Sequence, residues 1–263
     1  MNDLRTAVEA AADVLAFAPA ALVTDVDGTL SRIVSRPENA TVDEEIRSSL
    51  RQLVGRVALV AIVTGREESV ARSMVGLPEL TYVGNYALDT ESAEVVDEDD
   101  LDAARVLVRT LLQPFPCVEI EEKGVSFALH YRNCIDATMR ERILTLVSPV
   151  AAAAGGKLLE GKQVVEIVPV RLPDKSNAVA RLLREREIQG VVYLGDDLGD
   201  VPVFQQLARR RTQGLPSLGV AVIDPETHVA VMESADMYLD GVDEVNAFLT
   251  ALGTPADLRS SVL

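Results

Sequence analysis

The sequence predicts an α/β fold: a doubly wound parallel sheet with a smaller α+β domain inserted into it. Short, wholly apolar runs alternate with segments of helical periodicity near both ends of the chain, and such runs are typical of parallel strands buried on both faces. In the middle of the chain the order changes to strand, strand, helix, strand, strand. A chain of 263 residues, 48% of them hydrophobic, suggests one large domain or two modest ones.

The first outer segment begins with a short amphipathic helix and continues as alternating strands and helices. Apolar residues recur at helical spacing in the helices, whereas the strands are unbroken apolar runs that end in polar loops. The predicted order is helix 3–17, strand 20–26, helix 42–55, strand 57–63, helix 67–75 and strand 80–83.

The middle segment differs because it contains a strand of alternating polarity, which is typical of a half-exposed sheet. Its first helix ends before Pro114 and Pro116, and the pair Gly155-Gly156 separates its second helix from two further strands. The predicted order is helix 101–112, strands 117–121 and 125–132, helix 136–153, and strands 157–159 and 164–168.

The strand and helix alternation returns after the insertion. We expect the two outer segments to build one Rossmann-like core from residues 1–100 and 170–263, with residues 101–169 as the smaller domain. The predicted order in the last segment is helix 175–187, strand 191–194, helix 200–210, strand 218–223 and helix 242–252.

The chain is strongly acidic, with 41 acidic against 25 basic residues and a formal net charge of −16. Such a field repels phosphate backbones, so we expect no nucleic acid partner. It also opposes an anionic substrate, and any phosphate site must therefore be built locally from a metal ion, a lysine and backbone N–H groups. We expect the protein to act as a monomer on a small molecule.

Cysteine usage and hydropathy predict a cytoplasmic protein. Cys117 and Cys134 are too few for a disulfide framework and lack metal-site spacing, so we expect two small buried thiols in a reducing compartment. Acidic residues interrupt the apolar positions of the N-terminus, which argues against a secretory signal. The apolar run 57–63 is far too short to span a membrane, and no membrane partner is expected.

A pair of carboxylates follows the first predicted strand, in Asp25-Val26-Asp27-Gly28-Thr29. Alternation along an extended backbone sends both carboxylates the same way, and the glycine allows a sharp turn with exposed N–H groups. One carboxylate can attack phosphorus while the other transfers protons. The alternative, an acidic turn that caps the next helix, explains one aspartate but not the whole motif.

Two further polar motifs lie at predicted helix beginnings. Thr64-Gly65-Arg66 follows the second strand, where a hydroxyl and N–H groups can hold phosphoryl oxygens, although the same residues also suit an ordinary helix start. Lys175 begins a helix and can offset the charge of a phosphate and of the carboxylates. A lone lysine is otherwise usually a surface residue.

The last motif is the run GDDLGD at 195–200, directly after another apolar strand. Carboxylate oxygens in a rigid loop suit Mg²⁺, while an acidic helix start is the alternative. All four motifs fall in loops beyond the carboxyl ends of strands, where open α/β sheets bind their ligands. Their order along the chain is nucleophile, hydroxyl, lysine and metal carboxylates.

This ordered set resembles the haloacid dehalogenase superfamily of phosphohydrolases. The resemblance implies that Asp25 is the nucleophile and Asp27 the general acid and base, with Thr64 and Lys175 holding the phosphate. It also implies two in-line steps through an aspartyl-phosphate. The inserted domain would then be the cap domain of this superfamily.

The same resemblance implies a Mg²⁺ cofactor. Asp25, Asp196 and the backbone carbonyl of Asp27 would hold the ion. Asp197 and Asp200 would be further ligands or would lie directly behind them.

The inserted domain is also similar to the cap of the trehalose-6-phosphate phosphatases, through KGVS at 123–126, LHYR at 129–132, GK at 161–162 and VEIVP at 165–169. This resemblance implies a sugar phosphate substrate, trehalose-6-phosphate first. Charged side chains of the cap would bind the sugar hydroxyls, because a site that must hydrogen-bond a hydroxyl rejects analogues that lack it. The residues implied in substrate binding are Gly28, Arg66, Lys123, His130, Arg132 and Glu166.

Departures from that family's pattern leave the substrate open. Tyr86-Ala87 stands where the family usually has His-Gly, Gly199 and Val201 replace a threonine and a glutamate, and Ser176 replaces a glycine. These changes remove no catalytic group. Phosphatases of sucrose-6-phosphate or mannosyl-phosphoglycerate type therefore remain alternatives.

Two structural alternatives also stay open. His130 and Glu166 can equally be half-exposed strand residues with no role in binding. A non-catalytic sugar-phosphate-binding protein of the same fold is the alternative to an enzyme, and it would be expected to have lost Asp25, Asp27 or Lys175.

Overall fold

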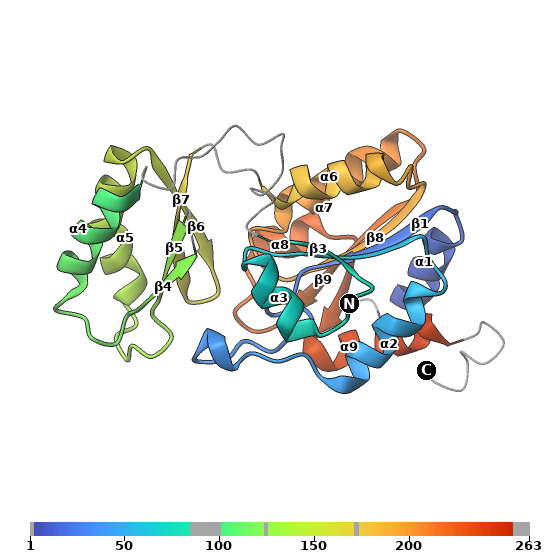
Figure 1. Ribbon diagram of the computed structural model, residues 1–263, viewed down its shortest axis with the longest axis horizontal. Helices are drawn as coiled ribbons and strands as arrows, with labels where there is room; N and C mark the ends of the chain where they lie inside the picture. The colour runs from blue at the N-terminus through green and yellow to red at the C-terminus, as the bar shows by residue number, and fades with distance from the viewer. Residues whose placement is uncertain (1–2, 85–100, 124–125, 171–173, 255–263) are drawn as a thin grey trace. The chain divides into compact units, whose positions relative to one another are not determined.

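The computed structural model describes residues 3–84, 101–123, 126–170 and 174–254 (Figure 1). The chain divides into two compact units. We call Met1–Ala87 with Asp174–Leu263 the core unit and Leu88–Pro173 the cap unit. Each unit has its own sheet and its own hydrophobic core.

The core unit contains a six-stranded parallel sheet in the order β10-β9-β8-β1-β2-β3. The chain builds β1, β2 and β3 outward on one side and then returns to build β8, β9 and β10 on the other. The central strand β1 therefore lies at the point where the winding reverses. The strands are β1 (Ala20–Thr24), β2 (Leu59–Val63), β3 (Thr81–Val83), β8 (Gly190–Gly195), β9 (Ser217–Ile223) and β10 (Met237–Asp240).

Helices cover both faces of this sheet, which confirms the predicted doubly wound α/β fold (Figure 1). Successive residues of β1 point to opposite faces, so Leu22 packs in one core and Ala21 and Val23 pack in the other. One face carries α1 (Leu4–Leu15), α2 (Glu44–Val54), α3 (Glu68–Val75) and α9 (Gly241–Gly253), and the other carries α6 (Lys175–Glu185), α7 (Val201–Thr212) and α8 (Val229–Ser234).

The sequence patterns missed the 3₁₀ helix Pro37–Asn39, the helix α8 and the edge strand β10. The helix α8 has only 6 residues, too few to show a helical repeat of apolar positions. The strand β10 has only 4 residues and is mostly half-buried, so it gives no long apolar run. His228 precedes α8, and its side chain accepts a hydrogen bond from the backbone N–H of Ala230.

The cap unit contains an antiparallel sheet in the order β4-β5-β7-β6, with two helices. Phe127 and Ile167 point from the sheet into a core that is completed by Val108 and Ile143 of the helices. The opposite face of the sheet carries the polar side chains considered below. The elements are α4 (Asp102–Leu112), β4 (Glu119–Lys123), β5 (Ser126–His130), α5 (Met139–Ala153), β6 (Gly156–Gly161) and β7 (Val164–Pro169).

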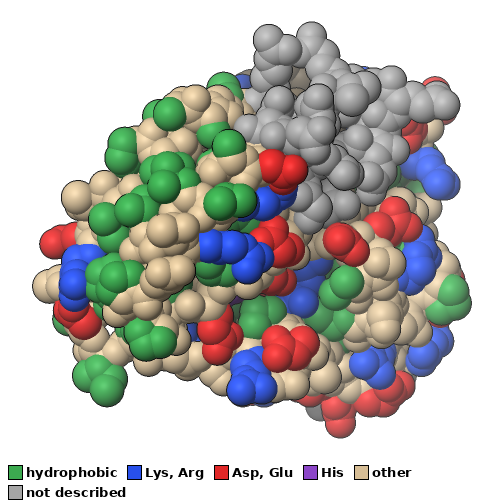
Figure 2. All heavy atoms as spheres, turned by 60° about the vertical axis from the view of Figure 1, so that its left-hand side comes forward, with side chains coloured by type: hydrophobic (Ala, Val, Ile, Leu, Met, Phe, Trp, Pro, Cys, Tyr) green, Lys and Arg blue, Asp and Glu red, His purple; other side chains and the backbone are tan. Residues whose placement is uncertain are grey.

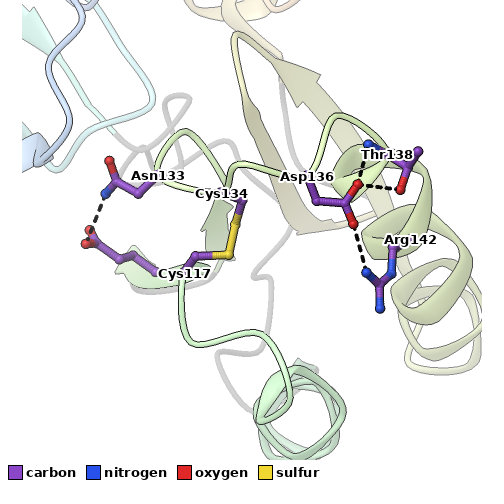
Figure 3. Close-up of a disulfide and its surroundings, with 7 residues drawn as sticks. Cys117, Asn133, Cys134, Asp136, Thr138 and Arg142 are labelled. Atoms are coloured by element: carbon purple, nitrogen blue, oxygen red, sulfur yellow. Dashed lines mark hydrogen bonds and ion pairs between the residues drawn. A yellow bond between two sulfur atoms is a disulfide. The ribbon is translucent and has the colours of Figure 1, made fainter.

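The expectation of two free thiols is wrong, because Cys117 and Cys134 form a disulfide (Figure 3). The two cysteines flank the paired strands β4 and β5, in which Glu119 lies opposite His130. The Cα atoms of Cys117 and Cys134 are 5.1 Å apart. Counting cysteines does not reveal this proximity, since it depends on strand register. The cysteines therefore give no support to a reducing compartment.

The described part of the chain contains no helix that is both long enough and apolar enough to cross a membrane.

The face of the molecule shown in Figure 2 mixes apolar side chains with charges of both signs. Basic side chains are scattered over the described part of this face and do not form one broad surface.

Candidate active site

Three polar loops meet at the carboxyl end of the core sheet. They follow β1, β2 and β8, and β1 pairs directly with both other strands. The backbone N–H of Asp25 donates to the carbonyl of Leu194 at 2.9 Å, which joins the first loop to the end of β8. The cluster therefore lies where the winding of the sheet reverses, the usual ligand position in such folds.

Lys175 is the cation at the centre of this cluster. Its Nζ lies 3.0 Å from Asp25 Oδ2, 2.8 Å from Asp200 Oδ1 and 3.9 Å from Asp197 Oδ1. The side chain is only 4% exposed, although it stands in the first turn of α6 directly after the capping residue Asp174. Burial alone would lower the pKa of Lys175, but Asp200 and Asp25 raise it well above its ordinary value, so the lysine stays charged.

Asp25 and Asp196 are buried carboxylates on adjacent loops. Asp25, Asp196 and Asp200 each offer an oxygen, and these oxygens all lie within 4.8 Å of one another. Burial raises the pKa of Asp25 well above its ordinary value, and the neighbouring aspartates add to this effect while Lys175 opposes it. Thr29 Oγ1 donates to Asp196 Oδ1 at 3.0 Å.

Gly28 is required at its position for two reasons. Its φ of +78° lies in the left-handed region, and a Cβ atom there would be 2.0 Å from Asp196 Oδ2. The turn after β1 can therefore approach the carboxylate of Asp196 only without a side chain.

Asp200 is fully buried, and each of its oxygens accepts two hydrogen bonds. Oδ1 accepts from Lys175 Nζ at 2.8 Å and from Tyr193 Oη at 2.6 Å. Oδ2 accepts from the backbone N–H groups of Asp196 at 2.8 Å and Asp197 at 3.1 Å. Although burial opposes its ionisation, the charge and hydrogen bond of Lys175 and the other donors lower the pKa of Asp200.

Asp27 pairs with Arg66. The guanidinium donates from Nε to Asp27 Oδ2 at 2.5 Å and from Nη2 to Asp27 Oδ1 at 2.7 Å. Nη2 also donates to the carbonyl of Pro37 at 3.2 Å. Such a two-point pair fixes the direction of both side chains.

Thr64 is buried at the end of β2, and its Oγ1 accepts a hydrogen bond from the backbone N–H of Arg66 at 3.3 Å. The helix α3 begins at Glu68, four residues beyond Thr64, with Glu67 as its capping residue. The Thr64 hydroxyl therefore belongs to the loop. It does not lie in the first turn of a helix, which was the alternative that the sequence left open.

The cap unit brings most of its predicted binding residues together on the sheet face that points away from the helices. Glu166 is 6% exposed, and it accepts from Ser126 Oγ at 2.6 Å and from Lys123 Nζ at 3.4 Å. His130 Nε2 lies 2.8 Å from Glu121 Oε2, which is also 3.7 Å from Lys123 Nζ. A buried glutamate is costly unless it is paired, so this polar face is a specific arrangement.

Arg132 follows β5, and its Nη2 donates to the carbonyl of Lys162 at 3.0 Å, so it connects two of the motifs that resemble the trehalose-6-phosphate phosphatase cap. Tyr86-Ala87, the departure from that family at the end of β3, lies outside the described residues.

Sequence reasoning missed Tyr193 in the core unit and Glu121 and Ser126 in the cap unit. Tyr193 is a polar residue inside the apolar run of β8, which was a usable signal. Ser126 ends the KGVS motif but was given no role, and Glu121 had no such signal, because only the register of β4 and β5 brings it beside His130.

Comparison with known proteins agrees with this geometry. Residues 23–242 match the trehalose-phosphatase family. Trehalose-phosphate phosphatase of Mycobacterium avium (strain 104) is 29% identical over 235 residues, which cover 83% of this chain and 59% of that protein. The chain thus spans less than two thirds of the length of this curated relative.

Solved structures show the same fold. The C-terminal domain of Candida albicans trehalose-6-phosphate phosphatase is similar with a TM-score of 0.79 at 19% identity, over 96% of this chain and 97% of that one. A haloalkanoate (HAD) superfamily phosphatase of Bacteroides thetaiotaomicron is similar with a TM-score of 0.56 at 14% identity, over 93% and 96% of the two chains. At these identities the likeness shows the fold alone.

Proposed function

Because the chain belongs to the trehalose-phosphatase family, we propose that it hydrolyses trehalose-6-phosphate to trehalose and phosphate through an aspartyl-phosphate on Asp25. The observation that carries this proposal is the buried cluster of Asp25, Lys175, Asp196 and Asp200 at the carboxyl end of the central strand β1. A nucleophilic carboxylate, a shielded cation and further carboxylates for a metal are the groups that phosphoryl transfer requires.

The reaction divides into two displacements at phosphorus. In the first, an Asp25 oxygen bonds to phosphorus, the bond from phosphorus to the sugar oxygen breaks, and Asp27 gives a proton to the leaving oxygen. In the second, Asp27 takes a proton from water, the water oxygen bonds to phosphorus, and the acyl-phosphate bond breaks to restore Asp25. Lys175 offsets negative charge on the phosphoryl oxygens, and Thr64 contributes a hydroxyl to hold them.

Arg66 has a defined role in this scheme. Both oxygens of Asp27 accept from its guanidinium, and this two-point pair fixes the direction of the carboxylate. The hydrogen bond to the carbonyl of Pro37 gives the guanidinium a second point of attachment. We infer that Arg66 first orients Asp27 and then becomes available to the substrate phosphate.

The carboxylate cluster fits a divalent cation such as Mg²⁺. Asp25 and Asp196 offer hard oxygens within 4.8 Å of each other, and only a glycine at position 28 leaves room beside Asp196. Asp200 has donors on both oxygens, so we assign it a place behind the metal ligands, with Asp197 beside them. A bound Mg²⁺ would supply additional positive charge at the phosphoryl oxygens.

Mg²⁺ binding should weaken at acid pH. Burial raises the pKa of Asp197 to about 6, and the pKa of Asp25 is also raised, so the metal-free site retains protons that Mg²⁺ must displace. Since a raised pKa keeps the carboxyl protonated up to that pH, the Mg²⁺ dissociation constant should rise at least about tenfold between pH 7 and pH 5. Calorimetric titration of the protein without substrate measures this.

The matched control for that titration is Asp197→Asn, which should bind Mg²⁺ with a smaller change between the two pH values. Equal affinity at pH 7 and pH 5 in the unsubstituted protein would contradict the assignment of protonated carboxyls to the metal-free site.

The polar face of the cap unit supports a sugar as the leaving group. Lys123, His130, Arg132 and Glu166 offer donors and acceptors suited to hydroxyls, and three of them are linked through Glu121 by hydrogen bonds and ion pairs. We propose that these residues bind the sugar.

In the same scheme Gly28, which has no side chain, leaves its backbone accessible to the substrate phosphate. A cytoplasmic location and a monomeric state stay predictions.

A substrate panel tests the proposal. Phosphate release should be measured from trehalose-6-phosphate, sucrose-6-phosphate, glucose-6-phosphate and mannosyl-phosphoglycerate, each with Mg²⁺ and with a chelator. We expect a Mg²⁺-dependent preference for trehalose-6-phosphate. Preference for another ester would reject the assigned sugar and keep the chemistry, while failure to release phosphate from any of them would favour an untested substrate or a binding protein.

A further inference from the structure

Tyr193 is a buried tyrosine that the reaction scheme above does not use. It lies in β8 with no exposed surface, and its ring packs edge-on against Phe204 of α7 with ring centroids 5.8 Å apart. Its Oη donates to Asp200 Oδ1 at 2.6 Å. A phenylalanine would fill the same apolar surroundings, so what the tyrosine adds is the hydrogen bond to Asp200.

The effect of this hydrogen bond depends on the other contacts of Asp200. Oδ1 is shared by Lys175 and Tyr193, while Oδ2 accepts the backbone N–H groups of Asp196 and Asp197. One carboxylate therefore connects the phosphate-binding lysine to the loop that carries the metal carboxylates. Its orientation decides the positions of both.

Tyr193 is suited to fix that orientation. The other donor to Oδ1, Lys175, also lies 3.0 Å from Asp25 and has to meet the substrate phosphate, so its contact with Asp200 is shared. The tyrosine hydroxyl is neutral and is held by β8 and Phe204. Burial and the nearby charge of Asp200 raise the pKa of Tyr193 well above its ordinary value, so the hydroxyl keeps its proton as a donor.

There is also a steric constraint on the same carboxylate. A Cβ atom on Gly195 would lie 2.3 Å from Asp200 Cγ, so the backbone at the end of β8 contacts one side of this carboxylate. Tyr193 stands two residues earlier in the same strand, and alternate residues of a strand point to the same face. The end of β8 therefore supplies both the space for Asp200 and the donor that orients it.

We propose that Tyr193 is a positioning residue, whose hydroxyl orients Asp200 and thereby sets Lys175 and the loop of Asp196 and Asp197 for phosphoryl transfer. The proposal rests on the function proposed above. It assigns Tyr193 no contact with the substrate.

Tyr193→Phe and Tyr82→Phe form a matched pair for the test. Tyr82 is also buried and donates one hydrogen bond, at 2.8 Å to the carbonyl of Leu77, far along the chain from the carboxylate cluster. Each substitution removes one buried hydroxyl. We expect Tyr193→Phe to lower kcat about tenfold with KM changed less than twofold, and Tyr82→Phe to leave both within twofold.

A double-mutant cycle with Asp200→Asn shows whether Tyr193 acts through Asp200. In the Asp200→Asn background, Tyr193→Phe should lower kcat less than twofold further. Calorimetry without substrate gives an independent readout, in which Tyr193→Phe should raise the Mg²⁺ dissociation constant about tenfold and Tyr82→Phe should not change it.

The proposal is overturned if Tyr193→Phe and Tyr82→Phe have equal kcat and equal Mg²⁺ affinity, or if the two substitutions at 193 and 200 are additive. Failure of the proposed function looks different, because the unsubstituted protein would then hydrolyse none of the esters while the Mg²⁺ titrations still separate the two tyrosine variants.

Discussion

Asp25→Asn should abolish turnover, with kcat lowered by about 10⁴-fold or more, while the protein stays folded. Asparagine has nearly the same shape but cannot form the aspartyl-phosphate. Because burial raises the pKa of Asp25 well above its ordinary value, the ionised carboxylate is disfavoured in the metal-free folded state at neutral pH. Replacing it with a neutral group should therefore leave the metal-free protein at least as stable as before.

Steady-state kinetics and urea unfolding at pH 7 without metal check the two parts of this prediction. Asp243→Asn is the matched control, since Asp243 is largely exposed and pairs with Arg32 on the surface. It should leave kcat within twofold. Measurable turnover by Asp25→Asn above the level of a contaminating phosphatase would sink the assignment of the nucleophile.

Lys175→Met should damage both activity and stability. Methionine keeps much of the length of the side chain but removes the charge that pairs with Asp25, Asp197 and Asp200. Breaking a buried ion pair from one side leaves uncompensated charge and typically costs about 3–5 kcal/mol. The free energy of unfolding should fall by that amount at pH 7, and kcat should fall at least about a hundredfold because the phosphoryl charge loses its cation.

The pH dependence separates this cause from a simple packing defect. Without Lys175 the remaining carboxylates bind protons more readily when folded, so the stability lost at pH 7 should be partly regained as the pH falls toward 5. Lys157→Met in β6 is a control substitution of the same type outside the cluster. A Lys175→Met protein as stable as the parent at pH 7 would show that the lysine does not balance these carboxylates.

The core strands could be predicted from the sequence because parallel strands buried on both faces are continuous apolar runs. The predicted strands 57–63 and 191–194 correspond to β2 at Leu59–Val63 and β8 at Gly190–Gly195. The edge strand β10 could not be found in this way, because it is short and only partly buried, and its last residue is a charged aspartate.

The part of the site that could be predicted is the part that lies in loops directly after strands. Asp25, Asp196, Asp200 and Lys175 meet because their loops lie at one edge of the sheet, and the motifs marked those loops. The pairing of Asp27 with the guanidinium of Arg66 could not be predicted from the motif, because it joins the loops after two different strands.

Other features depended on contacts between distant segments. The donors to Asp200 come from β8, from α6 and from its own loop, so no single motif contains them. The disulfide depends on the register of β4 and β5, and the pairing of Glu121 with His130 does so as well. Spacing along the chain carries no information about such cross-strand neighbours.

The central claim is that the phosphoryl group passes through Asp25. Acid quenching of the protein during its first turnovers, followed by peptide mass spectrometry, tests it most directly. We expect phosphate on the peptide that contains Asp25, and none on that peptide in Asp25→Asn. Product formation with phosphate bound to another residue, or with no phosphorylated protein at any quench time, would contradict the account.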